Sequence, residues 1–271
     1  MNIPSLEGLS HALSDVAVQG RFALAYSGGL DSRFLAHAAR LLGLHPLLLH
    51  VTGPHVPPEE SEFARAWAER QKLPFRTVPL NPLQLPAVAE GARDRCYACK
   101  HYLFTALATQ SDLPLCDGTN ASDASAYRPG LRAVRELSVI SPLALAGLTK
   151  KDIHFLAEQT GMEEPDQKPR PCLLTRLPYG STPAEEILFA IAAGESAVRR
   201  TLARMDLSRV DFRLRLVAPG RLELHLLSSD ASAMPASLMD TLAEEAHAAM
   251  PGYPRPIPAF QENLSGFFDR T

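Results

Sequence analysis

The chain has 271 residues and a formal net charge of −3. Hydrophobic residues make up 46% and charged residues 21%, which excludes a disordered or collagen-like chain and indicates a globular protein of one or two domains. The negative net charge argues against a protein whose whole surface binds nucleic acid.

Strand-like and helix-like patterns alternate over the first 160 residues. In chain order we expect a helix over 5–18, a strand over 21–27, a helix over 34–44, a strand over 46–52, a helix over 59–73, a strand over 74–80, a helix over about 98–110, a strand over 113–119, an apolar segment over 137–143 and a helix over 149–161. This alternation predicts βαβ units and therefore an α/β fold with a doubly wound parallel sheet. Thr149 and Gly161 suit the two ends of the last helix.

The composition changes near residue 161. Residues 163–183 contain five prolines and no clear periodicity, which predicts an irregular segment between domains. After it we expect a long helix over 184–205, two alternating strands over 212–217 and 222–227, and a last helix over 234–249. We therefore expect two domains, residues 1–162 and residues 163–271, of which the second ends in a smaller α+β unit.

The expected cellular setting follows from what the chain lacks. No apolar run reaches the roughly 18–20 residues of a membrane span, and the first residues lack the basic start and apolar stretch of a secretory signal. Four cysteines in a chain of this length do not indicate a disulfide framework. We expect a cytoplasmic protein with reduced thiols and no membrane partner.

The loop SGGLDS (27–32) stands between a predicted strand and a predicted helix, where doubly wound sheets bind nucleotides. Its glycines allow a ligand to approach the backbone, the hydroxyls of Ser27 and Ser32 are donors, and the helix adds its positive end. The pattern predicts a phosphate site, although a glycine turn that only packs strand against helix is the alternative. The loop is neither a Walker A motif nor G-x-G-x-x-G. It resembles the PP-loop of ATP pyrophosphatases, which cleave ATP between the α and β phosphates.

Cys172 lies in KPRPCLLTRLPYG (168–180), close in sequence to Lys168, Arg170 and Arg176. Cationic neighbours lower the pKa of a thiol, so this cysteine is a candidate nucleophile. An isolated cysteine is more often a buried packing residue, and the residues alone leave both interpretations open.

The remaining three cysteines carry weaker signals. Cys96 and Cys99 form a C-x-x-C pair that can bind zinc or an iron–sulfur cluster, act as a redox pair, or only pack. Zinc is disfavoured because no second C-x-x-C completes an all-cysteine site. Cys116 falls in a predicted strand and is expected to be buried.

Six motifs in order resemble one family. They are SGGLDS (27–32), RCYACKHYLF (95–104), DGTNASD (117–123), YRPGLRA (127–133), SPLALAGLTKKDI (141–153) and PCLLTRLPYG (171–180). Together they resemble the LarE family of ATP-dependent sacrificial sulfur transferases, PP-loop proteins that help make the nickel-pincer nucleotide cofactor of lactate racemase. The resemblance covers about residues 20–230, and the cysteine-bearing motif is its most specific part.

The resemblance implies a defined chemistry. ATP adenylates one carboxylate of a pyridinium dicarboxylate mononucleotide, and the Cys172 thiolate displaces AMP. Elimination then leaves a thiocarboxylate on the substrate and dehydroalanine in the protein, so each chain acts once. The implied cofactors are ATP and magnesium or another divalent metal. We expect the small-molecule mononucleotide as partner, no nucleic acid, and a homo-oligomer.

The same resemblance assigns site residues, with Cys172 as the catalytic one. The nucleotide-binding residues are Ser27, Gly28, Gly29, Asp31, Ser32, Gly118 and Thr119. The substrate-binding residues are Arg176, Arg213 and Arg215, and the residues near a metal are Asp31, Glu195 and Glu223. Arg213 and Arg215 are two apart, so on a strand they share one face, and guanidinium groups suit phosphate and carboxylate. A solvated polar face is the alternative for the arginines and for Glu195 and Glu223.

Two departures from the family pattern and three competing hypotheses stay open. Ser122 stands where the family usually has the first of two acidic residues, and His154 stands where it often has arginine. Cys96, Cys99 and Cys172 keep open a LarE-like form that holds a [4Fe-4S] cluster and transfers sulfur catalytically. The second hypothesis is another PP-loop enzyme, for tRNA thiolation or amidation, and the third is a nucleotide-binding protein without catalysis.

Overall fold

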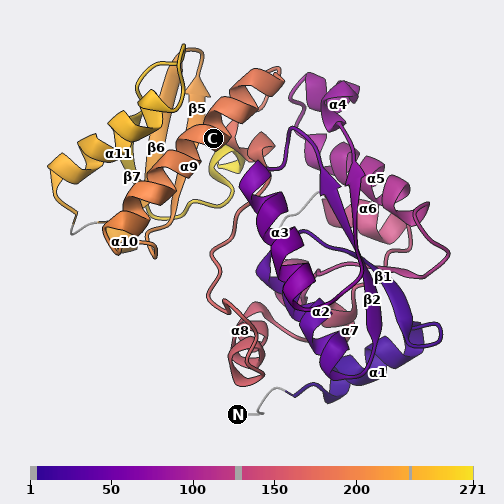
Figure 1. Ribbon diagram of the computed structural model, residues 1–271. Helices are drawn as coiled ribbons and strands as arrows, with labels where there is room; N and C mark the ends of the chain where they lie inside the picture. The colour runs from indigo at the N-terminus through magenta and orange to yellow at the C-terminus, as the bar shows by residue number, and fades with distance from the viewer. Residues whose placement is uncertain (1–4, 126–129, 232–233, 271) are drawn as a thin grey trace. The chain divides into compact units, whose positions relative to one another are not determined.

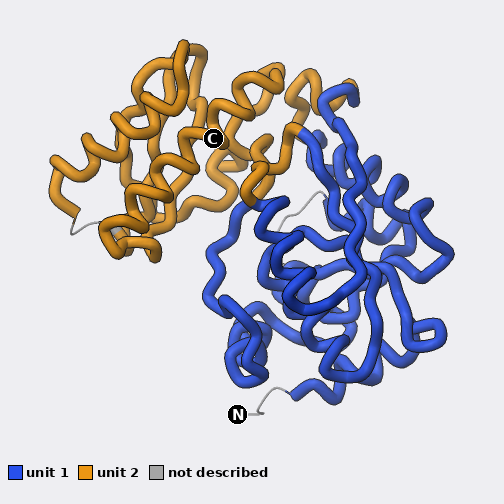
Figure 2. Tube along the Cα trace, viewed as in Figure 1, with its two compact units in different colours: residues 1–53, 60–85, 94–170 blue, residues 54–59, 86–93, 171–271 orange. Residues whose placement is uncertain are grey.

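The protein is described from a computed structural model that covers residues 5–125, 130–231 and 234–270. Residues 127–129 of the YRPGLRA motif lie outside the described residues. The chain forms two compact units (Figure 2): unit 1 is residues 1–53, 60–85 and 94–170, and unit 2 is residues 54–59, 86–93 and 171–271. The expected domain limits at 162/163 stay a prediction, and the second unit gathers two short segments from the first half of the chain.

Unit 1 is built on a four-stranded parallel sheet (Figure 1). Its strands are β1 (Arg21–Ala25), β2 (His45–Thr52), β3 (Phe75–Pro79) and β4 (Leu115–Cys116), in the order β3-β2-β1-β4. All pairs are parallel, and Ala23 of β1 is aligned with Leu47 on one side and Leu115 on the other. The predicted α/β fold with a parallel sheet is confirmed.

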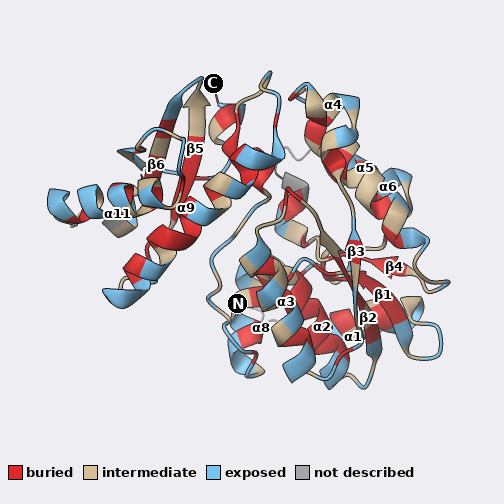
Figure 3. Ribbon diagram, turned by 45° about the horizontal axis from the view of Figure 1, so that its top comes forward, coloured by how far each residue is buried: buried red, intermediate tan, exposed pale blue. Residues whose placement is uncertain are grey.

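Alternate residues of the sheet enter two different cores, one on each face. Phe22, Leu24 and Leu48 pack with helices α1 (Glu7–Val16), α2 (Leu30–Leu41), α3 (Pro58–Arg70) and α8 (Lys150–Gln159). Ala23 and Leu49 pack with α5 (Arg95–Ala108) and α6 (Gly130–Glu136). Because successive residues of a strand point to opposite faces, helices cover both faces of the sheet, and the middle parts of β1 and β2 are buried between them (Figure 3).

The last strand of unit 1 is much shorter than its sequence pattern predicts. The pattern predicts a strand over 113–119, but β4 ends at Cys116. Asp117 then turns the chain, because its carboxylate accepts the backbone N–H of Thr119 at 3.1 Å and the Thr119 hydroxyl at 2.5 Å. The apolar segment after it contributes only an isolated bridge from Ile140 to Cys116. Shorter elements here are η1 (Pro82–Gln84), η2 (Ala121–Ser125) and α7 (Pro142–Leu145).

The predicted start of helix α8 is confirmed, whereas its C-cap is Thr160, one residue before the predicted Gly161. Thr149 is its N-cap, and a reciprocal capping box joins Thr149 to Asp152, whose carboxylate accepts the Thr149 backbone N–H at 2.9 Å. Gly161 follows the helix with a positive φ of 68°. These caps fix where α8 begins, next to the loop discussed below.

Unit 2 is a small α+β body, as predicted. Its main helices are α9 (Glu185–Arg204) and α11 (Ala236–Ala248), and its strands are β5 (Phe212–Ala218), β6 (Arg221–Leu227) and β7 (Ile257–Gln261). β5 pairs with β6 antiparallel, and β7 pairs with β6 parallel. The sequence pattern does not predict β7. Short elements are α4 (Pro86–Ala89), η3 (Leu173–Arg176), α10 (Ser228–Ala231) and η4 (Phe267–Asp269).

Two hydrogen bonds explain why unit 2 includes short segments from the first half of the chain. The backbone N–H of Leu173 donates to the carbonyl of His55, and that of Gly180 donates to the carbonyl of Gly91, both at 2.9 Å. The Arg93 guanidinium also lies over the Tyr179 ring, 5.3 Å from its centroid. The cysteine-bearing segment is therefore tied to the chain at both ends. In the described part of the chain, no helix is long and apolar enough to cross a membrane.

Candidate active site

The loop SGGLDS joins β1 to α2 and is held by its own two serines. The Ser27 and Ser32 hydroxyls are 3.2 Å apart, the Gly29 N–H donates to the Ser27 Oγ at 3.2 Å, and the Ser32 hydroxyl donates to the Gly29 carbonyl at 3.1 Å. Gly29 is the N-cap of α2, so the first N–H groups of a 12-residue helix begin here. This is the strand–loop–helix setting that suits a phosphate.

Two glycines allow close packing around this loop. A Cβ on Gly28 would lie 2.7 Å from the Cβ of Ala64, and Gly28 has a φ of 78°. A Cβ on Gly118 would lie 2.9 Å from the backbone nitrogen of Ser32. Gly118 therefore lies against the start of α2, which brings the two predicted nucleotide-binding segments together.

Asp31, in the first turn of α2, carries an unsatisfied oxygen. Its Oδ1 is buried and has no hydrogen-bond partner within the described part of the chain. Burial raises the pKa of this carboxyl, and Asp123 raises it further, while Lys150 and a hydrogen bond with Asn120 oppose the rise. A buried carboxylate oxygen without a donor suits a cation, so Asp31 fits the predicted role beside magnesium.

Helix α8 adds a cation that sequence reasoning missed. Lys150, its first residue, is exposed and acts on the Asp31 carboxyl electrostatically, as does His154 one turn later. The loop 27–32 has no lysine of its own. Lys150 of α8 could supply the positive charge that binds a phosphate there. The capping residue Thr149 marks the helix start in the sequence, but only the fold shows which residues α8 brings beside Asp31.

Cys172 is partly exposed and immediately precedes the 3₁₀ turn η3. Its carbonyl oxygen accepts two hydrogen bonds from Thr175, from the hydroxyl at 2.7 Å and from the backbone N–H at 3.0 Å. The peptide group between Cys172 and Leu173 is thus fixed at both of its polar atoms, because the Leu173 N–H donates to the His55 carbonyl.

Arg176 is buried in an ion pair. Its Nε and Nη2 donate to the two carboxylate oxygens of Glu195 at 2.6 and 3.1 Å, and its Nη1 donates to the Thr175 hydroxyl oxygen at 2.8 Å. Only 2% of Arg176 is exposed. Burial raises the pKa of Glu195, but Arg176 and the Leu214 N–H outweigh it and hold that pKa below its usual value. The sequence predicts cations close to the Cys172 thiol, but the charge of Arg176 is already neutralised by the Glu195 carboxylate.

Arg213 and Arg215 share one face of β5, as their spacing predicts. Arg213 pairs with Asp211. Arg215 donates from Nη1 to His225 Nδ1 at 2.7 Å and from Nη2 to the Leu264 carbonyl. Its Nε is buried without a hydrogen-bond partner within the described ranges. Burial, with Arg176 and Arg213 nearby, lowers the pKa of Arg215 to about 9, so an anion would be stabilised here.

Glu195 and Glu223, predicted to lie near a metal, are both bonded to donors of the protein itself. Both oxygens of Glu195 bind Arg176, while Glu223 accepts from Arg221 at 2.6 Å and from His225 at 2.7 Å. These protein donors already compensate part of the negative charge of both carboxylates, which weakens their attraction for a cation. Within the described residues, no three His, Cys, Asp or Glu side chains form a group that could hold a metal. The metal role of Glu195 and Glu223 stays a prediction, while Asp31, with its unpartnered Oδ1 in the described part of the chain, fits such a role directly.

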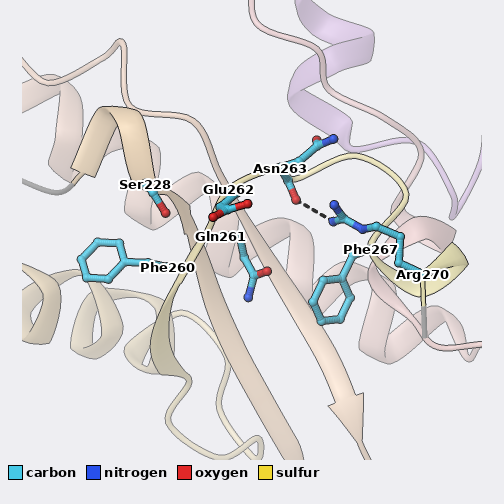
Figure 4. Close-up of a pocket in the computed structure, with 7 residues that line it drawn as sticks. All are labelled: Ser228, Phe260, Gln261, Glu262, Asn263, Phe267 and Arg270. Atoms are coloured by element: carbon cyan, nitrogen blue, oxygen red, sulfur yellow. Dashed lines mark hydrogen bonds between the residues drawn. The ribbon is translucent and has the colours of Figure 1, made fainter.

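Phe267 packs edge-to-face with His225, with ring centroids 4.5 Å apart, and the Arg215 guanidinium lies over the Phe267 ring. Phe267 and Arg270 also line an open pocket of about 500 Å³ beside β7, in which Arg270 donates to the Asn263 carbonyl at 2.8 Å (Figure 4). The pocket is completed by Ser228, Phe260, Gln261 and Glu262.

Comparisons with known proteins agree on one family. The chain is 33% identical over 186 residues to an uncharacterized protein of Synechocystis, and the aligned region covers 66% of this chain and 69% of that protein. It is 27% identical over 195 residues to an uncharacterized protein of Methanocaldococcus jannaschii, covering 70% and 74%. It is 27% identical over 185 residues to the pyridinium-3,5-bisthiocarboxylic acid mononucleotide synthase of Lactiplantibacillus plantarum, covering 66% and 67%. No family model matches the chain. The chain belongs to the LarE family.

One departure from the LarE pattern has a structural explanation. Ser122, where the family usually has an acidic residue, accepts the backbone N–H of Lys150 at 3.0 Å. It thereby satisfies one of the N–H groups that a helix start leaves open. His154, the second departure, bonds the Pro165 carbonyl at 3.0 Å. Ser122 therefore supports the helix start that carries Lys150.

The remaining cysteines of this LarE member differ in exposure. Cys99 and Cys116 are buried, Cys96 is partly exposed, and the four cysteines, all of them described, form no disulfide. Burial raises the pKa of Cys116 to about 12, so it stays a neutral packing group, as expected. A [4Fe-4S] cluster on Cys96, Cys99 and Cys172 remains an untested hypothesis.

Proposed function

We propose that this protein is an ATP-dependent sulfur transferase that adenylates a carboxylate of a pyridinium dicarboxylate mononucleotide and donates the sulfur of Cys172. The observation that carries the proposal is the likeness to the named pyridinium-3,5-bisthiocarboxylic acid mononucleotide synthase. The loop 27–32, built to receive phosphate, and a partly exposed Cys172 in the family's cysteine motif support it.

In the first step the substrate carboxylate attacks the α-phosphorus of ATP, and pyrophosphate leaves. The N–H groups at the start of α2 and the hydroxyls of Ser27 and Ser32 would bind the leaving phosphates. Asp31 would hold the divalent ion, which supplies charge neutralisation on the phosphates when bound. Lys150 would add a second positive charge from α8.

In the second step the Cys172 thiolate attacks the acyl carbon and AMP leaves, which gives a thioester. A base removes the Cα proton of Cys172, the Cα=Cβ bond forms and the Cβ–S bond breaks. The thiocarboxylate leaves with the electron pair, and dehydroalanine remains in the chain. Arg213 and Arg215 would bind the substrate phosphate, for which the unpartnered Nε of Arg215 is suited.

The test is the intact mass of the protein before and after incubation with ATP, magnesium and the pyridinium dicarboxylate mononucleotide. We expect the loss of one hydrogen sulfide per chain, mapped to residue 172 and absent in Cys172→Ala. AMP formation with an unchanged mass would contradict sacrificial transfer and favour a cluster-dependent form or another PP-loop substrate. If no AMP forms and the mass does not change, the proposed activity is contradicted.

A further inference from the structure

Elimination at Cys172 requires a place for negative charge. When the Cα proton leaves, electron density moves onto the carbonyl oxygen of the same residue, which becomes enolate-like. The Cα–H of a peptide is a very weak acid, so donors aimed at this oxygen lower the barrier. The chemistry therefore depends on what surrounds the Cys172 carbonyl as well as on the thiol.

The Cys172 carbonyl oxygen already has two donors. The Thr175 hydroxyl lies 2.7 Å from it and the Thr175 backbone N–H lies 3.0 Å from it. Both distances fall within the range found for donors of an oxyanion hole. A 3₁₀ turn alone supplies only the N–H, so the second donor comes from the choice of residue at position 175.

A cation stands behind the hydroxyl donor. Arg176 donates from Nη1 to the Thr175 hydroxyl oxygen at 2.8 Å, which leaves the hydroxyl proton for Cys172 and polarises that O–H bond. Glu195 fixes Arg176 through two hydrogen bonds, and the Leu214 N–H donates to the Glu195 Oε1 at 3.0 Å. The Thr175 hydroxyl is thus oriented by a buried ion pair anchored to β5.

We propose that Thr175 is a catalytic residue whose hydroxyl and N–H stabilise the enolate oxygen of Cys172 while dehydroalanine forms, and that Arg176 and Glu195 are positioning residues for it. This rests on the proposed function. The Cα proton passes to a solvent base, the electron pair of the C–H bond forms the Cα=Cβ bond, and the thiocarboxylate departs with the pair of the Cβ–S bond. No oxidant or reductant is needed.

The decisive variants are Thr175→Val, which removes the hydroxyl and keeps the N–H, and Thr175→Ser, which keeps both. In single turnovers with ATP, magnesium and the mononucleotide, Thr175→Val should release AMP at the wild-type rate. It should then accumulate the thioester, seen as an added substrate mass, and form dehydroalanine about 100-fold more slowly. Thr175→Ser should restore elimination to within a few-fold of wild type.

A matched control separates this role from a structural one. Thr241→Val removes a similar hydroxyl-to-carbonyl bond in α11, 2.9 Å to Ser237, and should change neither step. Equal slowing of AMP release and elimination in Thr175→Val would overturn the proposal, as would elimination at the wild-type rate.

A second experiment needs no substrate and so separates this inference from the proposed function. Cysteines bis-alkylated with a dibromoalkane diamide eliminate to dehydroalanine in mild base, and mass mapping gives the rate at each position. The ratio of the rate at Cys172 to that at Cys96 should fall about 100-fold in Thr175→Val and recover in Thr175→Ser. An unchanged ratio would overturn the role of Thr175, whether or not the mononucleotide is the substrate.

Discussion

The loop at Asp31 and the ion pair of Arg176 with Glu195 hold charge in opposite ways. Asp31 has a buried oxygen without a donor within the described ranges, and Gly118 packs closely against its backbone. Arg176 uses all three of its nitrogens, and both oxygens of Glu195 are bonded. Polar groups left unsatisfied indicate a place for a ligand, whereas fully paired charges indicate a fixed scaffold. Changes at Asp31 should cost function without loss of stability, whereas changes at Arg176 or Glu195 should cost stability in addition to the orientation of Thr175.

The largest effect is expected from Glu195→Gln. The substitution leaves the Arg176 cation buried with a neutral partner, so the free energy of unfolding should fall by about 3 kcal/mol. Urea unfolding followed by circular dichroism measures it. The control is Glu136→Gln, which breaks the exposed Arg132–Glu136 pair and should have no measurable effect.

The same variant has a pH signature. Pairing holds the pKa of Glu195 below its ordinary value of 4.5, so its stabilisation is complete above that value and is lost as pH falls through the lower folded pKa. The difference in stability between wild type and Glu195→Gln should therefore shrink in acid. A constant difference between pH 7 and pH 3 would show that the pair does not account for the loss.

Gly118→Ala tests whether the close approach of Gly118 to the start of α2 is required for the proposed nucleotide site. A Cβ there would collide with the backbone of Ser32, shifting the start of α2. Pyrophosphate release from ATP should fall about 100-fold, while the thermal midpoint changes little. Gly8→Ala is the matched control, since its Cβ would meet Ala146 at an ordinary 3.6 Å. Full activity in Gly118→Ala would remove the DGT segment from the nucleotide site.

Lys150→Ala sharpens the contrast by removing a charge that faces the loop. The KM for ATP should rise about tenfold, the loss of one charge-assisted contact, with a smaller change in kcat. Lys151→Ala is the matched control, because it removes a lysine from the same helix and Lys150 is the lysine that acts on Asp31. Equal effects of the two variants would show that only the general charge of α8 matters.

Asp31→Asn should have the smallest effect on the protein alone, and in the stabilising direction. Because the folded pKa of Asp31 is raised, its ionised form at pH 7 is less favourable in the folded than in the unfolded chain, and stability falls as pH rises through 3.8 toward the folded pKa. The neutral variant should gain about 2 °C in Tm.

The ligand-free gain should be accompanied by a functional loss. Asp31→Asn should lose the further rise in Tm that magnesium and ATP give the wild type. Exposed Asp112→Asn is the control and should show neither change. A lower Tm for ligand-free Asp31→Asn would contradict the view that the ionised Asp31 carboxylate lowers the stability of the folded protein and is retained to bind a cation.

What could be predicted from the sequence depended on how local the signal is. The SGGLDS loop, the N-cap at Thr149 and the pattern of each predicted strand or helix lie within short stretches of sequence, and the fold bears out most of these elements. Strand β7 was missed because Ile257–Gln261 includes a proline and shows no alternation. Its pairing with β6 comes from the tertiary fold.

The candidate site shows the same limit. Spacing indicated that Arg213 and Arg215 share a face, but Glu195 lies 19 residues from Arg176 in sequence, and no local pattern joins them. Family likeness pointed to Glu195 and Glu223 as metal neighbours, whereas their hydrogen bonds go to arginine and histidine. Partners of buried charges are decided by packing between distant elements, so only the fold reveals them.

The segments 54–59 and 86–93 have a consequence for the order of synthesis. His55 and Gly91 leave the ribosome long before Leu173 and Gly180, the residues whose N–H groups they accept. During translation those two carbonyls cannot form these hydrogen bonds until about two thirds of the chain has been made, and until then water can bond to them. A gene fragment that begins at residue 171 would lack both carbonyls, so we expect it to fold poorly, whereas a circularly permuted chain that retains them should fold.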